Sequence, residues 1–254
     1  SVCTPVLNEA FFIKIWLENV STWTDEIIIT DGGSNDKTVE IIKDFKAKNP
    51  NLLVDLKISP QSGSPYSTDW QENKVRNDLL DRCSGNYIVI QDSDEVITRN
   101  DLIKSVIILE SAEKSLGHMT FIPYWGDLHT IRLNTPTDPA WFGSQIARIF
   151  RRNHWKFGNQ SHHCTLSHYK EGRSLRAFTE HTVNTGALLH HLHYGFGKAG
   201  LKTRDNRRGD LGSQYSDDWE GNTIEPIFDS KDTVTQIRTA PYSGPYPDIL
   251  KEYL

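Results

Sequence analysis

The hydrophobic pattern of the first half of the chain alternates between two periods. Four short segments are largely apolar and rich in β-branched residues: 1–7, 26–30, 51–58 and 86–91. Three longer segments between them place apolar residues three or four positions apart: 9–20, 37–48 and 69–83. The first pattern is typical of strands covered on both faces, and the second of helices with one buried face. Their alternation predicts parallel strands joined by right-handed crossovers.

The pattern changes after residue 125. Residues 128–133 and 145–150 read as strands of a mixed sheet. Residues 188–208 start apolar and end with clustered basic residues, which predicts a basic helix at their end. From residue 213 the chain has no clear period, and we expect a loop or a mobile tail there. The organisation that follows is a single α/β domain with an α/β half at 1–125, a second half at 126–212 and an extension at 213–254.

Polar clusters follow three of the predicted strands. Asn8 and Glu9 follow the first strand, residues 31–36 ("DGGSND") follow the second, and residues 92–95 ("DSDE") follow the fourth. Ligands of parallel sheets bind at the carboxyl ends of the strands, so these clusters should converge on one crevice. Residues 31–36 match neither GxGxxG nor the P-loop pattern, and they read as a tight turn whose following amides favour an anion.

The acidic segment at residues 92–95 places three carboxylates directly after an apolar run. Such charges repel one another and are costly to bury unless a positive group lies among them. Carboxylate ligands of this kind suit Mg²⁺ or Mn²⁺ shared with a diphosphate. The alternative is a solvated turn in which Asp94 caps the next helix.

Histidines are concentrated in the second half of the chain. Six of the ten lie in or near two short clusters, 162–168 and 190–193: His162, His163, His168, His190, His191 and His193. They can supply one metal ligand and one general base. In an extended segment His191 and His193 share a face and His190 points the other way. We favour His193 as the ligand, because a turn at 194–195 would expose it to the crevice. A zinc site is the alternative, with these ligands: His162, Cys164, His191 and His193.

Charge and cysteine content narrow the function classes. The chain has 33 acidic and 28 basic residues and a net charge of −5, which argues against nucleic acid as the main partner because phosphate-backbone binding relies on basic excess. Three widely spaced cysteines read as reduced thiols, so we expect a cytoplasmic protein. No apolar run is long enough to cross a bilayer, and no leader is visible, so we expect no membrane span.

Two segments, 4–42 and 73–97, resemble the family 2 glycosyltransferases of the GT-A fold in order and spacing. The matching positions are the Pro-x-x-Asn-Glu opening, the acid after the second strand, the Arg-Asn pair and the Asp-x-Asp motif: Pro5, Asn8, Glu9, Asp31, Arg76, Asn77, Asp92 and Asp94. The resemblance implies a Rossmann-like, mostly parallel central sheet followed by a mixed acceptor-side region. It also implies a nucleoside-diphosphate sugar donor, a carbohydrate or other hydroxyl acceptor, a divalent cation and inversion at the anomeric carbon.

The same resemblance assigns roles to these positions. The donor nucleoside would lie against five of the matching positions: Pro5, Asn8, Glu9, Asp31 and Arg76. Asp92 would hold the ribose or a metal-bound water, and Asp94 would ligate the metal directly. Many members have a second acid where Gly32 stands here, so an acid that often reads a uracil is absent.

The general base has two candidates. Some members carry His-Glu where this chain has His162 and His163, so we expect His163 to be the base. Asp127, which follows a predicted strand, is the next candidate. Two other functions stay open: a sugar nucleotidyltransferase, which would need a glycine-rich basic loop after the first strand, and a non-catalytic nucleotide- or carbohydrate-binding domain, against which the acidic motif argues.

Overall fold

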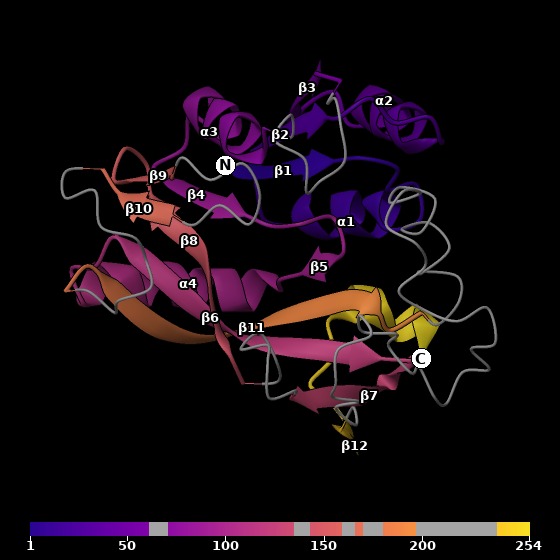
Figure 1. Cartoon of the computed structure of the whole chain (residues 1–254), viewed down its shortest axis with the longest axis vertical. Coiled ribbons are helices and arrows are strands. Elements are labelled where there is room, and N and C mark those ends of the chain that lie inside the picture. The colour runs from indigo at the N-terminus through magenta and orange to yellow at the C-terminus, as the bar shows by residue number, and fades with distance from the viewer. Residues whose placement is uncertain (61–70, 135–142, 159–165, 170–179, 197–237) are drawn as a thin grey trace, which may run out of the picture.

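Four parallel strands form one half of the sheet, in the order β3-β2-β1-β4 (Figure 1). Their bounds are β1 Val2–Val6, β2 Glu26–Asp31, β3 Leu53–Ile58 and β4 Tyr87–Ile90. The computed structural model describes residues 1–60, 71–134, 143–158, 166–169, 180–196 and 238–254. In the register of β1 and β2, Val6 lies beside Asp31, so both strands deliver their following loops to the same edge.

Helices cover both faces of this half, because the strands are apolar on both sides. Three helices make the cover: α1 Ile13–Val20, α2 Thr38–Lys48 and α3 Glu72–Arg82. Ile27 and Ile29 belong to a buried cluster that includes residues of α1 and α2. Ile28, between them, belongs to a second cluster that includes residues of α3. The continuous apolar run of β2 therefore serves two separate halves of the core.

Antiparallel pairing dominates the second half. β8 (Gln145–Arg151) runs antiparallel to both β4 and β6 (Leu116–Trp125), and β7 (Asp127–Asn134) pairs with β6. A long strand, β11 (Thr182–Tyr194), lies parallel to β6 and also pairs with the two-residue strand β5 (Glu95–Val96). The predicted mixed sheet is thereby confirmed.

Smaller elements complete the described part of the chain. Helix α4 is Arg99–Ser111, and a 3-10 helix, η1, covers Asp248–Tyr253. The strands β9 (Trp155–Phe157) and β10 (Leu166–His168) form a separate two-stranded sheet. None of the described helices is long and apolar enough to span a membrane.

The structure describes only part of the region after residue 188, so it tests only some of the expectations for that region. The apolar start of 188–208 is the end of strand β11, whereas the basic helix predicted after it lies outside the described residues. The start of the extension at 213–254 also lies outside them. Its end adds strand β12 (Arg238–Pro241) to the free edge of β7. The domain boundaries at 125 and 212 stay predictions.

Candidate metal and nucleotide site

The loops that follow β1 and β2 are joined by reciprocal hydrogen bonds. The backbone N–H of Asn8 donates to Oγ of Ser34, and the N–H of Asn35 donates to Oδ1 of Asn8, both at 2.8 Å. The N–H of Glu9 donates to Oγ1 of Thr38, also at 2.8 Å. Asn8 has φ +54°, a conformation that asparagine tolerates better than most residues. The first two polar clusters therefore converge, as the strand-end argument predicts.

Asp31 is fully buried and closes the turn that follows β2. Its Oδ1 accepts hydrogen bonds from the N–H groups of Gly33 and Ser34, both at 2.9 Å, and its Oδ2 accepts one from the Ser34 hydroxyl. Gly33 has φ +96°, which only glycine adopts readily. Both carboxylate oxygens are thus occupied by the turn, and the nucleoside contact implied for Asp31 stays a prediction.

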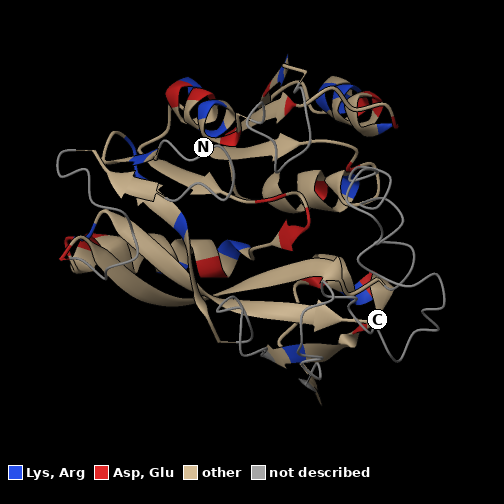
Figure 2. Ribbon diagram, viewed as in Figure 1, with Lys and Arg blue, Asp and Glu red and all other residues tan. Residues whose placement is uncertain are grey.

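A partly buried charge network holds the acidic segment after β4. Arg76 on α3 bonds Glu72 at 2.7 Å and Oδ1 of Asp92 at 3.2 Å. Arg148 on β8 bonds Oδ2 of Asp92 at 3.3 Å. It also holds Glu95 by two bonds, Nε to Oε2 at 2.8 Å and Nη2 to Oε1 at 2.6 Å. Figure 2 shows acidic colour at β5 and basic colour on β8 across from it.

The pKa values of Asp92 and Glu95 shift in opposite directions within this network. Burial raises the pKa of Asp92, but Arg76 and Arg148 outweigh it and hold that pKa below its usual value. Glu95 is only 1% exposed, and its burial raises its pKa to about 7 even though Arg148 acts in the other direction. Asp92 is therefore a stable anion, whereas Glu95 titrates near neutral pH.

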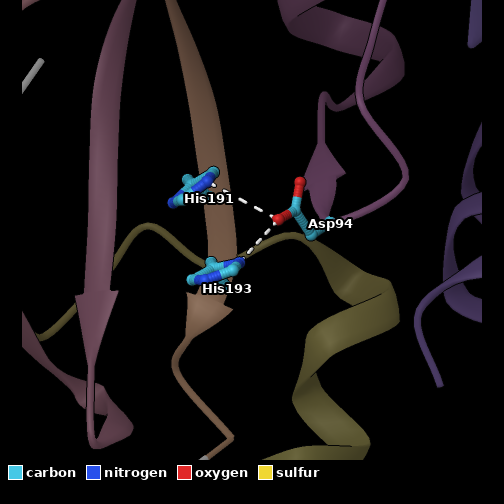
Figure 3. A group of neighbouring side chains, drawn as sticks. All are labelled: Asp94, His191 and His193. Atoms are coloured by element: carbon cyan, nitrogen blue, oxygen red, sulfur yellow. Dashed lines mark hydrogen bonds and ion pairs between the residues drawn. The ribbon is translucent and has the colours of Figure 1, made fainter. Parts of the chain in front are cut away.

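A second cluster joins Asp94 to the two histidines that share a face of β11 (Figure 3). Oδ2 of Asp94 lies 3.0 Å from Nδ1 of His193 and 3.7 Å from Nε2 of His191. One ligand atom from each residue lies within 4.8 Å of the others. Asp94 is buried and is not a helix cap, because Thr98 caps the next helix. The capping alternative is therefore wrong, and these residues form a candidate metal centre.

The two histidines differ in exposure from what their sequence context suggests. His193 is followed by a turn, in which the N–H of Gly195 donates to the carbonyl of Leu192, but it is only 2% exposed, so the expected exposure is wrong even though His193 lies nearest Asp94. The His191 side chain is 19% exposed. His190 lies on the opposite face, where its ring stacks on Tyr124, as the alternation predicts.

The remaining candidates are placed as follows. Pro5 lies in β1 beside Thr30, and Glu9 is buried with its carbonyl accepting from the first turn of α1. Asp127, the first residue of β7, is exposed, and its Oδ1 accepts from the N–H of His129 at 2.9 Å. His162, His163 and Cys164 lie outside the described residues, so the histidine base and the zinc alternative stay predictions.

Sequence reasoning missed Arg148. The signal that could have found it is a basic residue inside an otherwise apolar strand segment, because a charge placed there needs a partner. Asn77, matched only as half of a pair, has a clear structural role. Its Oδ1 accepts from the N–H of Phe157 at 2.8 Å and its Nδ2 donates to the carbonyl of Phe157 at 3.1 Å, which anchors β9 on α3.

Known proteins are similar to this chain in sequence. The family model described as Glycosyl transferase family 2 matches residues 1–170. An uncharacterized glycosyltransferase of Mycoplasma pneumoniae is 28% identical over 145 residues, 55% of this chain and 45% of that protein. The poly(ribitol-phosphate) beta-glucosyltransferase of Bacillus spizizenii is 29% identical over 109 residues, 41% of this chain and 16% of that protein. The chain thus spans less than half the length of these curated relatives.

A solved structure extends the likeness over more of the chain. The mannosyltransferase PcManGT from Pyrobaculum calidifontis, in complex with GDP-Man and Mn²⁺, has a TM-score of 0.51 and 16% identity, covering 81% of this chain and 60% of that one. Similarity at this identity speaks for the fold alone, which is that of the GT-A glycosyltransferases. Because the family model covers well over half of its residues, this chain belongs to glycosyl transferase family 2.

Proposed function

We propose that the chain is a metal-dependent glycosyltransferase that moves a sugar from a nucleoside-diphosphate sugar to an acceptor hydroxyl with inversion. The observation that carries the proposal is the Asp94, His191 and His193 cluster beside the arginine-held Asp92. Both lie where the loops of a parallel sheet gather, which is the place such folds use for ligands. A nucleotide-sugar and a cation are also what the mannosyltransferase structure contains.

The donor would lie along the loops after β1, β2 and β4. Its nucleoside would contact residues named from the sequence: Pro5, Asn8, Glu9, Asp31 and Arg76. Asp92 is held by two arginines and serves as an acceptor for the ribose or for a metal-bound water better than as a direct metal ligand. The tight turn at Asp31 limits how far that residue can turn toward a base.

Asp94, His191 and His193 would hold the cation. Two imidazoles and one carboxylate suit a first-row transition ion such as Mn²⁺ better than Mg²⁺, which prefers oxygen ligands in strict octahedral geometry. When bound, such an ion supplies positive charge that stabilises the developing negative charge on a diphosphate leaving group. Three protein ligands leave coordination positions for phosphate oxygens.

Proton removal from the acceptor hydroxyl falls to His163, with Asp127 as the second candidate. The acceptor is a carbohydrate or another hydroxyl compound, positioned so that its oxygen attacks from the face opposite the diphosphate. Buried Cys3 and Cys83 are free thiols, which agrees with a cytoplasmic site of action.

Calorimetry with Mn²⁺ and either UDP or GDP tests the metal centre. Replacing a group that only orients a metal ligand typically weakens metal binding by about 10- to 100-fold, and we expect at least this loss for the ligand changes Asp94→Asn, His191→Ala and His193→Ala. His154→Ala, which removes an exposed histidine before β9, is the matched control and should bind as the wild type does. Unchanged Mn²⁺ affinity in all three ligand variants would refute the assignment. Nucleotide binding that is equally strong in EDTA would refute the metal bridge.

A further inference from the structure

Gln91 is a polar residue directly after an apolar strand. It follows Ile88, Val89 and Ile90, and its own side chain is fully buried. Its backbone N–H donates to the carbonyl of Cys3 at 3.2 Å, which fixes the residue to β1. A buried amide costs stability unless its atoms form hydrogen bonds. The glutamine at this position therefore needs a reason other than packing.

One end of this side-chain amide is hydrogen-bonded, and the other is not. Nε2 donates to the carbonyl of Glu95 at 2.7 Å, across the acidic segment. Oε1 accepts no hydrogen bond from any described residue. An apolar side chain of the same length would place no such oxygen in the core. The bond from Nε2 to Glu95 is therefore the contribution that distinguishes glutamine from an apolar residue here.

This bond is one of three that fasten the main chain around Asp94. The carbonyl of Asp94 accepts from the N–H of Leu192 at 2.7 Å. The N–H of Glu95 donates to the carbonyl of Asp92 at 3.0 Å. The carbonyl of Glu95 then accepts from Gln91. Three successive main-chain groups are thus held, and of these three bonds only the one from Gln91 is made by a side chain.

The short strand β5 depends on such bonds from outside its own ladder. It has two residues and pairs with β11 beside His191, whereas strands usually have about three residues or more. Arg148 holds the side chain of Glu95, and Gln91 holds its main chain. A shift of β5 would change the distance from Asp94 to the two histidines. Metal ligands must keep their geometry to within about 0.5 Å.

We propose that Gln91 is a positioning residue, which acts through the main chain of β5 to hold Asp94 at the correct distance from His191 and His193. The role rests on the metal centre proposed above, so its test measures the polypeptide and the metal separately. Groups that only orient metal ligands change metal affinity by about 10- to 100-fold when they are removed.

Two variants remove the bond in different ways. Gln91→Met keeps the length of the side chain but has no donor, and Gln91→Asn keeps an amide that is one methylene too short. Each should weaken Mn²⁺ binding about tenfold or more in calorimetry without nucleotide. In the metal-free protein the N–H of Leu192 should exchange with solvent about tenfold faster, because the turn that carries its acceptor opens more often.

Thr185→Val is the matched control. Its hydroxyl is buried on β11 and donates to the carbonyl of His118 at 2.9 Å. This variant therefore also loses a buried bond from a side chain to a main-chain carbonyl. It should bind Mn²⁺ as the wild type does and should leave the exchange rate of the Leu192 amide unchanged. Urea unfolding measures the stability lost in each variant.

The outcomes separate this proposal from the metal centre on which it rests. Mn²⁺ binding that is as tight in both Gln91 variants as in the wild type overturns the positioning role and leaves the metal centre in place. Unchanged exchange at Leu192 in these variants overturns it too. An equal loss of Mn²⁺ affinity in Thr185→Val overturns it as well, because general destabilisation then explains the effect. A wild-type protein that binds no Mn²⁺ refutes the metal centre and the positioning role together.

Discussion

Removing the guanidinium of Arg148 should expose how the acidic segment is held. In Arg148→Met the side chain keeps its apolar length, but Glu95 loses two charge-assisted hydrogen bonds of 2.6 and 2.8 Å. Asp92 is 35% exposed and keeps its bond to Arg76, so its share of the loss is small. Leaving one partner of a buried pair alone costs about 3–5 kcal/mol, and most of it should come from Glu95.

The loss should depend on pH, because Glu95 can escape by binding a proton. Its folded pKa, about 7, lies above its ordinary value of 4.5, so its contribution to the free energy of unfolding falls as pH rises through that window. Without Arg148 the folded pKa rises further and the window extends above pH 7. Each unit by which the folded pKa shifts corresponds to about 1.4 kcal/mol of stability. The destabilisation should therefore be greater at pH 8 than at pH 6 by about 1–2 kcal/mol.

Urea unfolding followed by tryptophan fluorescence, with EDTA present, measures the free energy of unfolding of the wild type and Arg148→Met at pH 6 and pH 8. The double variant Arg148→Met, Glu95→Gln should regain part of the loss, because neither charge is then left unpaired. Arg148→Lys keeps the positive charge but cannot form both hydrogen bonds to Glu95. Its free energy of unfolding should lie between those of the wild type and Arg148→Met. Equal losses at both pH values together with no recovery in the double variant would refute this account of the network.

Three further changes test other parts of the structure. Asn77→Ala removes both bonds to the backbone of Phe157 and should cost about 1–3 kcal/mol and speed amide exchange at Phe157; slow exchange there would contradict the anchoring role. Asp31→Ala removes the two carboxylate oxygens that accept three hydrogen bonds in its turn and should destabilise by about 3 kcal/mol in urea unfolding; a loss within error would show that the turn holds without them. His163→Ala should lower kcat by about 100-fold with donor binding intact, and wild-type turnover would move the base to Asp127.

Local periodicity was enough to predict the parallel half of the fold. The run at 26–31 is apolar without alternation because helices pack on both of its faces, and the turn at residues 31–36 follows from its glycines and short polar side chains. The alternation within 190–193 also predicted which histidines share a face. These features depend on neighbours within a few residues, which a sequence displays directly.

Features that depend on distant pairing were harder to predict. Arg148 meets Glu95 because β8 lies beside β4, and nothing near residue 148 indicates that partner. Strand β6 contains Gly117 and Pro123, which interrupt a strand pattern. Helix α4 exposes Ile103 and Ile107, so its apolar residues do not mark one clean face. Trp155 is 4% exposed and donates from Nε1 to Ser115 at 3.1 Å, which makes it part of the core.

The irregularity in β11 has a consequence for engineering. The register of β11 on β6 shifts between His191 and Tyr194, and the N–H of Leu192 donates at 2.7 Å to the carbonyl of Asp94. The spacing between residue 94 and residues 191 and 193 is thus fixed by the main chain as well as by side-chain contacts. Asp94→His would then place a third imidazole beside His191 and His193. Three histidines are a ligand set that holds zinc in other enzymes. The metal preference of the proposed centre would then be open to redesign at three side chains while the backbone that presents them is kept.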